Sequence, residues 1–569
     1  MKKAQADCAA SGGTVDWHGI NWAKAHQATR KLQVRIAKAT GEGRHGKAKS
    51  LQWLLTHSFH GKAIAVKRVT ENDGKRTAGV DGETWDTPNS KAQAIVGLKR
   101  RGYKPMPLRR VYIPKANGKQ RPLGIPTMKD RAMQALHLLA LEPIAETTAD
   151  PNSYGFRPQR ACRDAAGQIF SSISRKAGAA WILEADITGC FDNISHKWLL
   201  ANIPTDRVVL KKWLKAGFVW KGVRSDTEAG TPQGGIISPV LANMTLDGLE
   251  TELTKAFPKN RKNAYKVNFI RYADDFIITG ASPEVLEEAK TITVRFLEAR
   301  GLTLSPEKTK VVGISEGFDF LGWNFRKYEG KMLVKPAKKN VKNFLAGIRQ
   351  LIDSNKTTTH ENLIRLLNPK IRGWAEYHRN QVAKETFSDV DNAIWKKLWR
   401  WARRRHPNKP KRWVKNRYWP YHNGCDWTFG LKVPGKEGTG VWQDLLKASS
   451  IPIVRHTKIR AAANPYDPAD EEYFEERFQR HFKEEAHGAR VKYLWHSQNG
   501  KCAACGEKLT KQTGWDVHHV IWRVNGGTDD SRNLALLHPN CHHQVHSRAS
   551  KKVADSPEKE LKGGLSRMW

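Results

Sequence analysis

Apolar residues at helical spacing mark the first part of the chain. Leu32, Ile36 and Ala39 share one face of a helix, and the same spacing returns at Leu51 and Leu55. This recurrence predicts helices between residues 20 and 70.

A pair of extended segments follows over residues 108–126. Leu108–Pro114 and Gln120–Pro126 are mostly apolar, and Asn117-Gly118 lies in the short link between them. Two such runs joined by an Asn-Gly turn predict a β-hairpin.

Aspartates interrupt three further apolar stretches. Asp186 lies near the end of one, and Asp274 and Asp275 separate Val267–Tyr272 from Phe276–Thr279. The last two stretches predict a hairpin with the aspartates at its tip. Charges among apolar strands cost free energy unless something compensates them, and divalent cations prefer carboxylate oxygens. Taken alone, however, Tyr-Ala-Asp-Asp also fits a polar hairpin turn.

The three aspartates suit phosphoryl transfer if their strands are neighbours in one sheet. Two Mg²⁺ ions ~3.5–4 Å apart can clamp the attacking and leaving oxygens of an in-line displacement. Such a pair needs carboxylates that converge from separate strands, as Asp186 and the pair Asp274 and Asp275 could.

The second half of the chain is more basic and more helical. Trp374, Trp395, Trp399, Trp401 and Trp413 are spaced through a Lys- and Arg-rich region after residue 335. Residues 464–485 are acidic and predict a further helix. For each Trp alone, a place in a helical core remains the alternative to contact with a nucleic acid.

The excess of basic residues indicates what class of molecule this protein binds. The chain has 569 residues with 97 Lys and Arg against 56 Asp and Glu, a formal net charge of +41, and 21 Trp. That excess predicts a polyanionic partner, with rings available to stack on bases. The sequence has no apolar stretch of ~18 residues and no secretory signal near Met1, so we expect no membrane partner.

Cysteine and histidine spacing predicts two metal sites near the C-terminus. Seven Cys, an odd number, suit a reducing compartment better than a disulfide framework. A structural Zn²⁺ site has four candidate ligands: Cys502, Cys505, His538 and Cys541. Their C-x₂-C and H-x₂-C spacing is typical of zinc.

Five more polar residues surround this set: His518, His519, Asn533, His542 and His546. His542 and His546 lie four residues apart, on one face of a helix. The order resembles the HNH endonuclease ββα-metal motif. That resemblance implies that His519 is the general base, that His518, His542 and His546 hold one divalent ion, Mg²⁺ or another, and that Asn533 orients the loop. The alternative is a zinc knuckle with a purely structural role.

Ordered motif blocks resemble the group II intron-encoded reverse transcriptases, or maturases, of bacterial type. The blocks span 108–325 and comprise Arg110–Lys115 with Arg121–Pro126, Ser153–Pro158, Asp186–Asp192, Gly230–Gly235 with Ser238 and Pro239, Tyr272–Asp275, and Phe318–Trp323.

The resemblance implies roles for individual residues. Asp186, Asp274 and Asp275 would be catalytic and bind two Mg²⁺ ions. The dNTP would contact four residues: Lys115 and Arg121 at the triphosphate, Gln233 at the sugar or base, and Phe191 at the position that excludes a 2′-hydroxyl. Core packing for Phe191, and a solvated hairpin face for Lys115 and Arg121, remain alternatives.

The basic region resembles the thumb and maturase domain of the family, which implies binding to intron RNA. The candidate contacts are Arg372, Trp374, Tyr377, Trp399, Arg400, Arg403, Arg404 and Arg405.

The implied fold class is a multidomain α+β protein: a right-hand polymerase, a basic helical maturase region and a small ββα-metal module. We expect a disordered tail at 1–15, fingers and palm at 16–335, thumb and maturase domain at 336–450, a DNA-binding region or linker at 451–486, the HNH endonuclease domain at 487–550 and a tail at 551–569.

The implied function is RNA-directed DNA synthesis combined with splicing of the intron RNA and nicking of double-stranded target DNA during retrohoming. The expected location is the bacterial cytoplasm, in association with the nucleoid. Two other functions stay open: an RNA-binding splicing cofactor with decayed enzymatic sites, and a homing-type DNA endonuclease whose polymerase-like part only binds nucleic acid.

Overall fold

Helices fill the first part of the chain, which confirms the prediction for residues 20–70. The computed structural model describes residues 15–114, 118, 120–231, 234–258, 264–422, 424–434, 440–485, 489–510, 513–522, 528 and 530–554. The N-terminal helices are α1 (Trp22–Gly41), α2 (His45–His57), α3 (Phe59–Glu71) and α4 (Pro88–Gly97). Most of the two predicted tails, residues 1–14 and 555–569, lies outside the described ranges.

Side-chain caps mark where α1 and α3 begin. The side chain of Asn21 accepts a hydrogen bond from the Lys24 backbone at the start of α1, and Ser58 does the same for Gly61 in α3. Such caps satisfy donors that have no partner within the helix. The buried faces of α1 and α3 pack on the long helix α5 (Met128–Thr148).

The predicted hairpin at 108–126 is confirmed as part of a four-stranded sheet. Strand β1 (Leu108–Pro114) pairs antiparallel with β2 (Gln120–Ile125), and the sheet continues through β4 (Phe218–Trp220) and β5 (Val223–Ser225) in the order β2-β1-β4-β5. The predicted turn residue Asn117 lies outside the described residues.

A second four-stranded sheet forms the palm. Its order is β6-β7-β3-β8, built from β3 (Trp181–Asp186), β6 (Asn268–Tyr272), β7 (Asp275–Gly280) and β8 (Lys310–Gly313). The helices in this part of the chain are α6 (Cys162–Ile173), α7 (Cys190–Asn193), α8 (His196–Asn202), α9 (Arg207–Leu214), α10 (Ser238–Leu246), α11 (Leu249–Ala256) and α12 (Pro283–Glu298).

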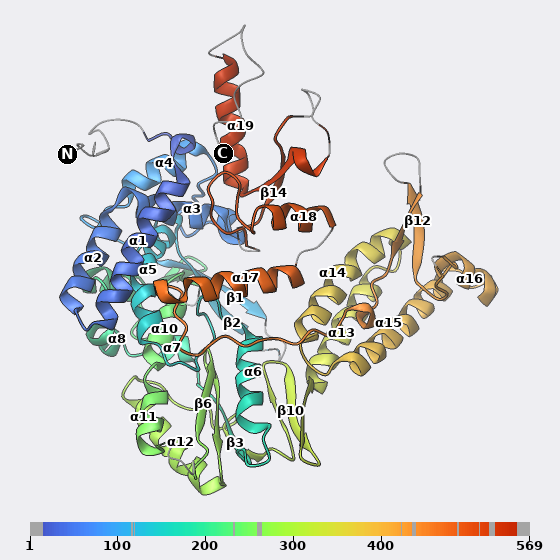
Figure 1. Cartoon of the computed structure of the whole chain (residues 1–569), viewed down its shortest axis with the longest axis horizontal. Coiled ribbons are helices and arrows are strands. Elements are labelled where there is room, and N and C mark those ends of the chain that lie inside the picture. The colour runs from blue at the N-terminus through green and yellow to red at the C-terminus, as the bar shows by residue number, and fades with distance from the viewer. Residues whose placement is uncertain are drawn as a thin grey trace.

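Beyond the palm, a small sheet leads into a helical arm that projects from the body (Figure 1). The sheet has the order β11-β10-β9, and the arm has its own apolar core. The elements are β9 (Phe318–Phe320), β10 (Trp323–Tyr328), β11 (Lys331–Pro336), α13 (Lys338–Ser354), α14 (His360–His378), α15 (Lys384–Arg405), α16 (Lys411–Tyr418), β12 (Gly430–Pro434) and β13 (Gly440–Asp444). The two strands after α16 differ from the wholly helical region that the sequence predicted after residue 335.

Residues 451–470 form a mostly extended strap that returns from the arm to the body. The strap crosses α6, where the buried Asp164 carboxylate accepts hydrogen bonds from His456 at 2.8 Å and from the Ile459 backbone at 2.8 Å. The helix expected over 464–485 begins only at Glu471, as α17 (Glu471–Glu485). This segment, expected to be a linker or DNA-binding region, therefore packs on the palm.

The C-terminal module packs on the N-terminal helices, and its core is continuous with theirs (Figure 1). The Trp17 indole donates to Asn540 Oδ1 at 2.8 Å, and Gln544 donates to the Ile20 carbonyl at 2.8 Å. Its elements are α18 (Ala489–Ser497), β14 (Asp516–His519), β15 (Leu534–Leu537) and α19 (Pro539–Ala554). Among the helices that the structure describes, none has the length and apolar character to cross a membrane.

Candidate functional sites

Strand pairing brings the predicted catalytic aspartates together. β3 runs antiparallel to β7, and in that register Asp186 is the partner of Asp275. Asp274 precedes Asp275 at the tip of the β6–β7 hairpin. The condition set by the sequence, that the two strands be neighbours in one sheet, is met.

The hairpin tip has an unusual backbone held by a close contact. Ala273 has a φ of 59°, in a region that side chains other than glycine seldom adopt. Gly155 lies against this turn, so that a Cβ on Gly155 would come within 2.2 Å of the Ala273 nitrogen. The Tyr154 backbone also donates to the Arg271 carbonyl at 2.9 Å. The Tyr-Gly-Phe-Arg-Pro block thus supports the turn that carries the aspartates.

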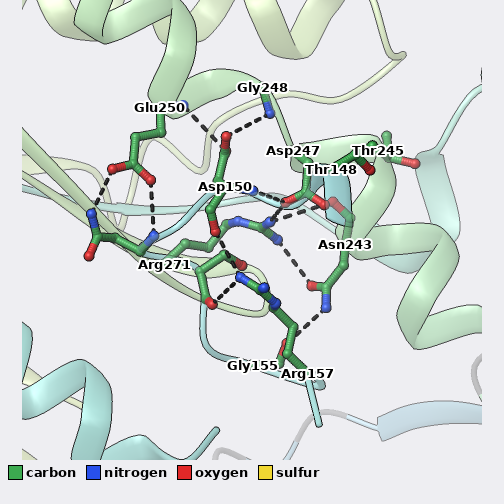
Figure 2. Close-up of polar contacts among 12 residues, drawn as sticks. Thr148, Asp150, Gly155, Arg157, Asn243, Thr245, Asp247, Gly248, Glu250 and Arg271 are labelled. Carbon is green, nitrogen blue, oxygen red and sulfur yellow. Dashed lines mark hydrogen bonds and ion pairs between the residues drawn. The ribbon is translucent and has the colours of Figure 1, made fainter. Parts of the chain in front are cut away.

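A buried ion-pair network lies beneath the same turn (Figure 2). The Arg271 guanidinium, 1% exposed, pairs with Asp247 and donates to Asn243 Oδ1 at 3.1 Å. Asn243 in turn donates to the Gly155 carbonyl at 2.8 Å. Burial raises the pKa of Asp247 to about 7, although the Arg271 charge lowers it. Loss of either charged partner would leave the other buried, at a cost of about 3–5 kcal/mol.

Crowding raises the pKa of two of the candidate catalytic carboxylates, Asp274 and Asp275. Removal from solvent, the hydrogen bond with Asp186 and the charge of Asp274 raise the pKa of Asp275 to about 7, even though its side chain reaches the surface. Desolvation and the charge of Asp186 also raise the pKa of Asp274. Lys308 forms an ion pair with this cluster, with Nζ 2.7 Å from Asp186 Oδ2. This concentration of negative charge fits divalent cations.

The C-terminal module holds three histidines at the junction of a hairpin and a helix. His518 lies on β14, and His542 and His546 lie one turn apart on α19. Ligand nitrogens of the three come within 4.8 Å of one another, and the Nε2 atoms of His542 and His546 are 3.1 Å apart. The helical spacing predicted from the sequence is confirmed.

His518 is in the protonation state that binds metals. Burial, followed by the charges of His542 and His546, lowers the pKa of His518 to about 4, so its ring is neutral at physiological pH. The Asp516 carboxylate lies 3.3 Å from His542 Nδ1, an arrangement that orients a ligand ring and makes it more basic.

Asn533 holds the loop that follows β14. Its side-chain amide donates to the Ile521 carbonyl at 3.0 Å and the Thr528 carbonyl at 2.8 Å, and its Oδ1 accepts from the Ile521 backbone at 2.7 Å. Each polar group of the amide is therefore used to bridge the two sides of the loop.

A second set of ligands is fully buried in the same module. Cys502, Cys505, His538 and Cys541 present ligand atoms within 4.8 Å of one another. Hydrogen bonds from Cys505 and Cys541 lower the pKa of the Cys502 thiol, which favours the thiolate form that binds metal. Four soft ligands at this separation fit a tetrahedral ion such as Zn²⁺.

Four protein families match this chain in sequence. They are described as N-terminal domain of reverse transcriptase, at residues 17–98; Reverse transcriptase (RNA-dependent DNA polymerase), at 113–325; Group II intron, maturase-specific domain, at 341–419; and HNH endonuclease, at 502–548.

Individual proteins match over more than one of these regions. Protein YkfC of Escherichia coli (strain K12) is 31% identical over 337 residues, which cover 51% of this chain and 88% of YkfC. The group II intron-encoded protein LtrA of Lactococcus lactis subsp. cremoris is 29% identical over 396 residues, 58% of this chain and 65% of LtrA. A solved telomerase from Candida albicans covers 55% of this chain and 65% of its own at 12% identity, with a TM-score of 0.33 that carries no argument.

The chain belongs to the group II intron-encoded reverse transcriptases. It carries a reverse transcriptase domain, a maturase-specific domain and an HNH endonuclease domain. The multidomain α+β fold expected from the sequence is confirmed.

Of the four dNTP-binding candidates of this reverse transcriptase, the structure describes two, Arg121 and Phe191. Arg121 is exposed on β2, and its charge acts on Asp274 by lowering that residue's pKa. Phe191 is half-buried on α7 and packs edge-on against Phe156, with ring centroids 6.1 Å apart. Lys115 and Gln233 lie outside the described residues.

Several RNA-binding candidates of the maturase region make contacts within the protein. Trp374 stacks on Phe344 at 4.6 Å and donates to Asn340 Oδ1 at 2.8 Å, and Trp399 stacks on Trp395 at 5.7 Å. Arg405 donates to the Thr358 carbonyl at 2.8 Å. The other arginines of the set are exposed or half-buried: Arg372, Arg400, Arg403 and Arg404.

Tyr377, another of these candidates, also makes contacts within the protein. Its ring stacks on Trp323, with centroids 4.7 Å and planes 5° apart, and its hydroxyl donates to the Leu321 carbonyl at 2.7 Å. Tyr377 thus connects the arm to the Phe318–Trp323 block of the small sheet, and the side chain stays 39% exposed.

Lys308 and Asp516 were not predicted from the sequence, although both contact predicted site residues. Asp516 lies two residues before His518, so alternation along a strand could have placed both on one face. Lys308 precedes β8 by two residues and carries no pattern of its own. Only the pairing of β8 with β3 brings it to Asp186.

Proposed function

We propose that this chain copies intron RNA into DNA at Asp186, Asp274 and Asp275, with a primer that its own HNH domain makes available. The observation that supports this most directly is the pairing of Asp186 with Asp275 at the tip of the palm hairpin. The three carboxylates would hold two Mg²⁺ ions, which when bound activate a primer 3′-hydroxyl and stabilise the pyrophosphate leaving group.

The residues around the carboxylates would orient the substrates. Arg121, with Lys115 and Gln233 from the same motif blocks, would contact the dNTP, since a guanidinium binds phosphate through two parallel hydrogen bonds. Phe191 would lie against the sugar and exclude a ribonucleotide. The Arg271 network would keep the hairpin tip in place while substrates exchange.

Primer extension on an RNA template tests the polymerase. Asp274→Ala should abolish dNTP incorporation because it removes a metal ligand. Glu284→Ala is the matched control, since Glu284 is an exposed carboxylate on α12 of the palm. Unchanged incorporation by Asp274→Ala would refute the assignment.

For the nuclease we propose that His519 is the general base, with one divalent ion held by His518, His542 and His546. A histidine has a pKa near neutrality, which suits proton abstraction from water. Asn533 would keep the loop in register, and Cys502, Cys505, His538 and Cys541 would hold a structural Zn²⁺. The nicked strand of target DNA would then serve as primer.

Cleavage of an intron target site in double-stranded DNA tests this role. His519→Ala should lose nicking because no base remains. His543→Ala is the matched control, since His543 is exposed on α19 and belongs to neither ligand set. If both variants nick equally well, His519 is not the base.

The maturase-specific domain supports binding of intron RNA. We propose that this binding promotes splicing, that the protein acts as a ribonucleoprotein in the bacterial cytoplasm near the nucleoid, and that the domains divide near residues 335, 450 and 486. Splicing of the RNA that co-purifies with the protein, with and without added protein, tests the first point. Equal splicing in both reactions would exclude a maturase role.

A further inference from the structure

A cavity of about 280 Å³ opens between α15 and the segments after α16 in the helical arm. Aromatic side chains form much of its wall: Trp395, Trp419, Trp427 and Phe429. Pockets for drug-sized ligands start at about 300 Å³. This volume therefore suits a smaller planar group.

The aromatic wall is built from interlocking rings. Trp427 meets Trp395 edge-on with centroids 5.6 Å apart, and Trp419 meets Trp395 at 6.1 Å. Trp427 remains 44% exposed at the mouth, whereas Trp419 is fully buried. The Trp419 indole nitrogen has no hydrogen-bond partner among the described residues. Trp419 therefore belongs to the inner wall, and Trp427 is the ring that a ligand can reach from solvent.

The backbone at Trp427 is also unusual. Its φ of 60° lies in the left-handed region, which is an outlier for a bulky side chain. Lys415 holds the same segment from the side, with Nζ 2.6 Å from Asp426 Oδ1 and 5.7 Å from the centre of the Trp427 ring. The fold thus keeps this ring at the cavity mouth despite the strained backbone.

Charge around the cavity favours a polyanion. Lys447 lines the cavity and is exposed, and Lys396 and Arg400 are exposed on the same helix as Trp395. The lining carboxylate of Asp391 accepts hydrogen bonds from the Ala448 and Ser449 backbones at 2.7 and 2.9 Å, so it is already compensated.

We propose that this cavity binds one unstacked base of the intron RNA, stacked on Trp427, with Lys447 near an adjacent phosphate. Single-stranded regions of RNA are recognised in this way, by rings that receive splayed bases and cations that meet the backbone. The proposal rests on the RNA-binding function proposed above and adds a site that the arginine-rich pattern did not indicate.

Filter binding of the full chain to its co-purifying RNA, transcribed in vitro, tests this site. Trp427→Ala should weaken binding about 10-fold, in the range measured for loss of one base–aromatic stack. Trp427→Phe should retain most of the affinity because a flat ring remains. Thermal unfolding of both variants checks that the arm is folded. Ultraviolet crosslinking of the wild-type complex should attach RNA to the peptide that contains Trp427.

Trp413→Ala is the matched control, since Trp413 is 36% exposed in the same arm and does not line the cavity. Equal affinity of wild type and a folded Trp427→Ala variant, or equal losses in Trp427→Ala and Trp413→Ala, would overturn the proposal. If Trp427→Ala lowered the affinity for single-stranded DNA of the same sequence more than the affinity for the RNA, the proposal would be overturned as well. Failure of the wild-type chain to bind this RNA would instead refute the proposed maturase function.

Discussion

The palm carboxylates and the C-terminal histidines are two crowded clusters of candidate metal ligands, one acidic and one basic, whose pKa values shift in opposite directions. In the palm, mutual repulsion and desolvation raise the pKa of Asp275 to about 7. In the HNH domain, burial and neighbouring histidines lower the pKa of His518 to about 4. Asp275 and His518 are thus each driven toward the uncharged form.

The difference lies in what the uncharged form can do. A protonated carboxylate is a poor ligand, so protons compete with metal in the palm, whereas a neutral imidazole is already a ligand. Each site also has a partner of the opposite polarity: Lys308 at Asp186, and Asp516 at His542. The palm site is therefore suited to hard cations and the histidine site to a wider range of ions.

The largest expected effect is the independent loss of the two activities. Asp186→Asn should lower primer extension about a thousand-fold or more and leave nicking intact, because a metal ligand contributes several kcal/mol to the transition state. His542→Ala should do the reverse. Both activities are measured on the same preparations. Joint loss in either variant would show that the two sites depend on one another.

A smaller effect, on metal affinity, is expected from Asp516, whose carboxylate contacts His542. Asp516→Ala should lower the affinity for the nuclease metal about 10- to 100-fold, because His542 loses the group that orients its ring. Titration calorimetry with Mn²⁺ measures this, and Asp516→Glu should restore much of the affinity. If Asp516→Ala binds as tightly as wild type, the 3.3 Å contact has no part in binding.

The pH dependence of the palm should follow from Asp275. Because its pKa is raised, the carboxylate takes up a proton as pH falls through about 7. One competing proton raises the half-saturating Mg²⁺ concentration for primer extension by up to about tenfold per pH unit below that value. His518 stays neutral over the same range and contributes no such dependence. A flat Mg²⁺ requirement between pH 8 and 6 would contradict the raised pKa.

The smallest effect is expected at Lys308. Its ammonium group pairs with Asp186 but is 64% exposed, and an exposed pair contributes at most about 1 kcal/mol. Lys308→Ala should therefore increase Mg²⁺ affinity by no more than about 5-fold, as measured by direct binding. Lys310→Ala is the control, since Lys310 is similarly exposed and pairs with Glu184 instead. A decrease in affinity would mean that Lys308 does not compete with the ion.

Much of the molecule could be predicted from local patterns. The β1–β2 hairpin, the β6–β7 hairpin with Asp274 at its tip, and the one-turn spacing of His542 and His546 each depend on residues close in sequence. Such elements are specified by alternation, turn residues and helical periodicity. The order of the motif blocks was sufficient to indicate the family.

Contacts between distant segments could not be predicted in the same way. The Lys308–Asp186 pair, the Arg271–Asp247 pair and the stacking of Tyr377 on Trp323 join different elements, and no local signal marks them. Tyr377 is an example, because nothing near it in the sequence indicates that its hydroxyl donates to the Leu321 carbonyl of the small sheet.

The sequence by itself determined which chemical groups this protein has and in which order its domains follow. Tertiary structure decided which of those groups meet. Asp186 reaches Asp275 only through the register of β3 and β7, and Trp17 reaches Asn540 only because the C-terminal module shares a core with the first helices. The physical reason is that apolar burial and strand pairing act between surfaces, whose partners are chosen when the whole chain packs rather than by neighbours in sequence.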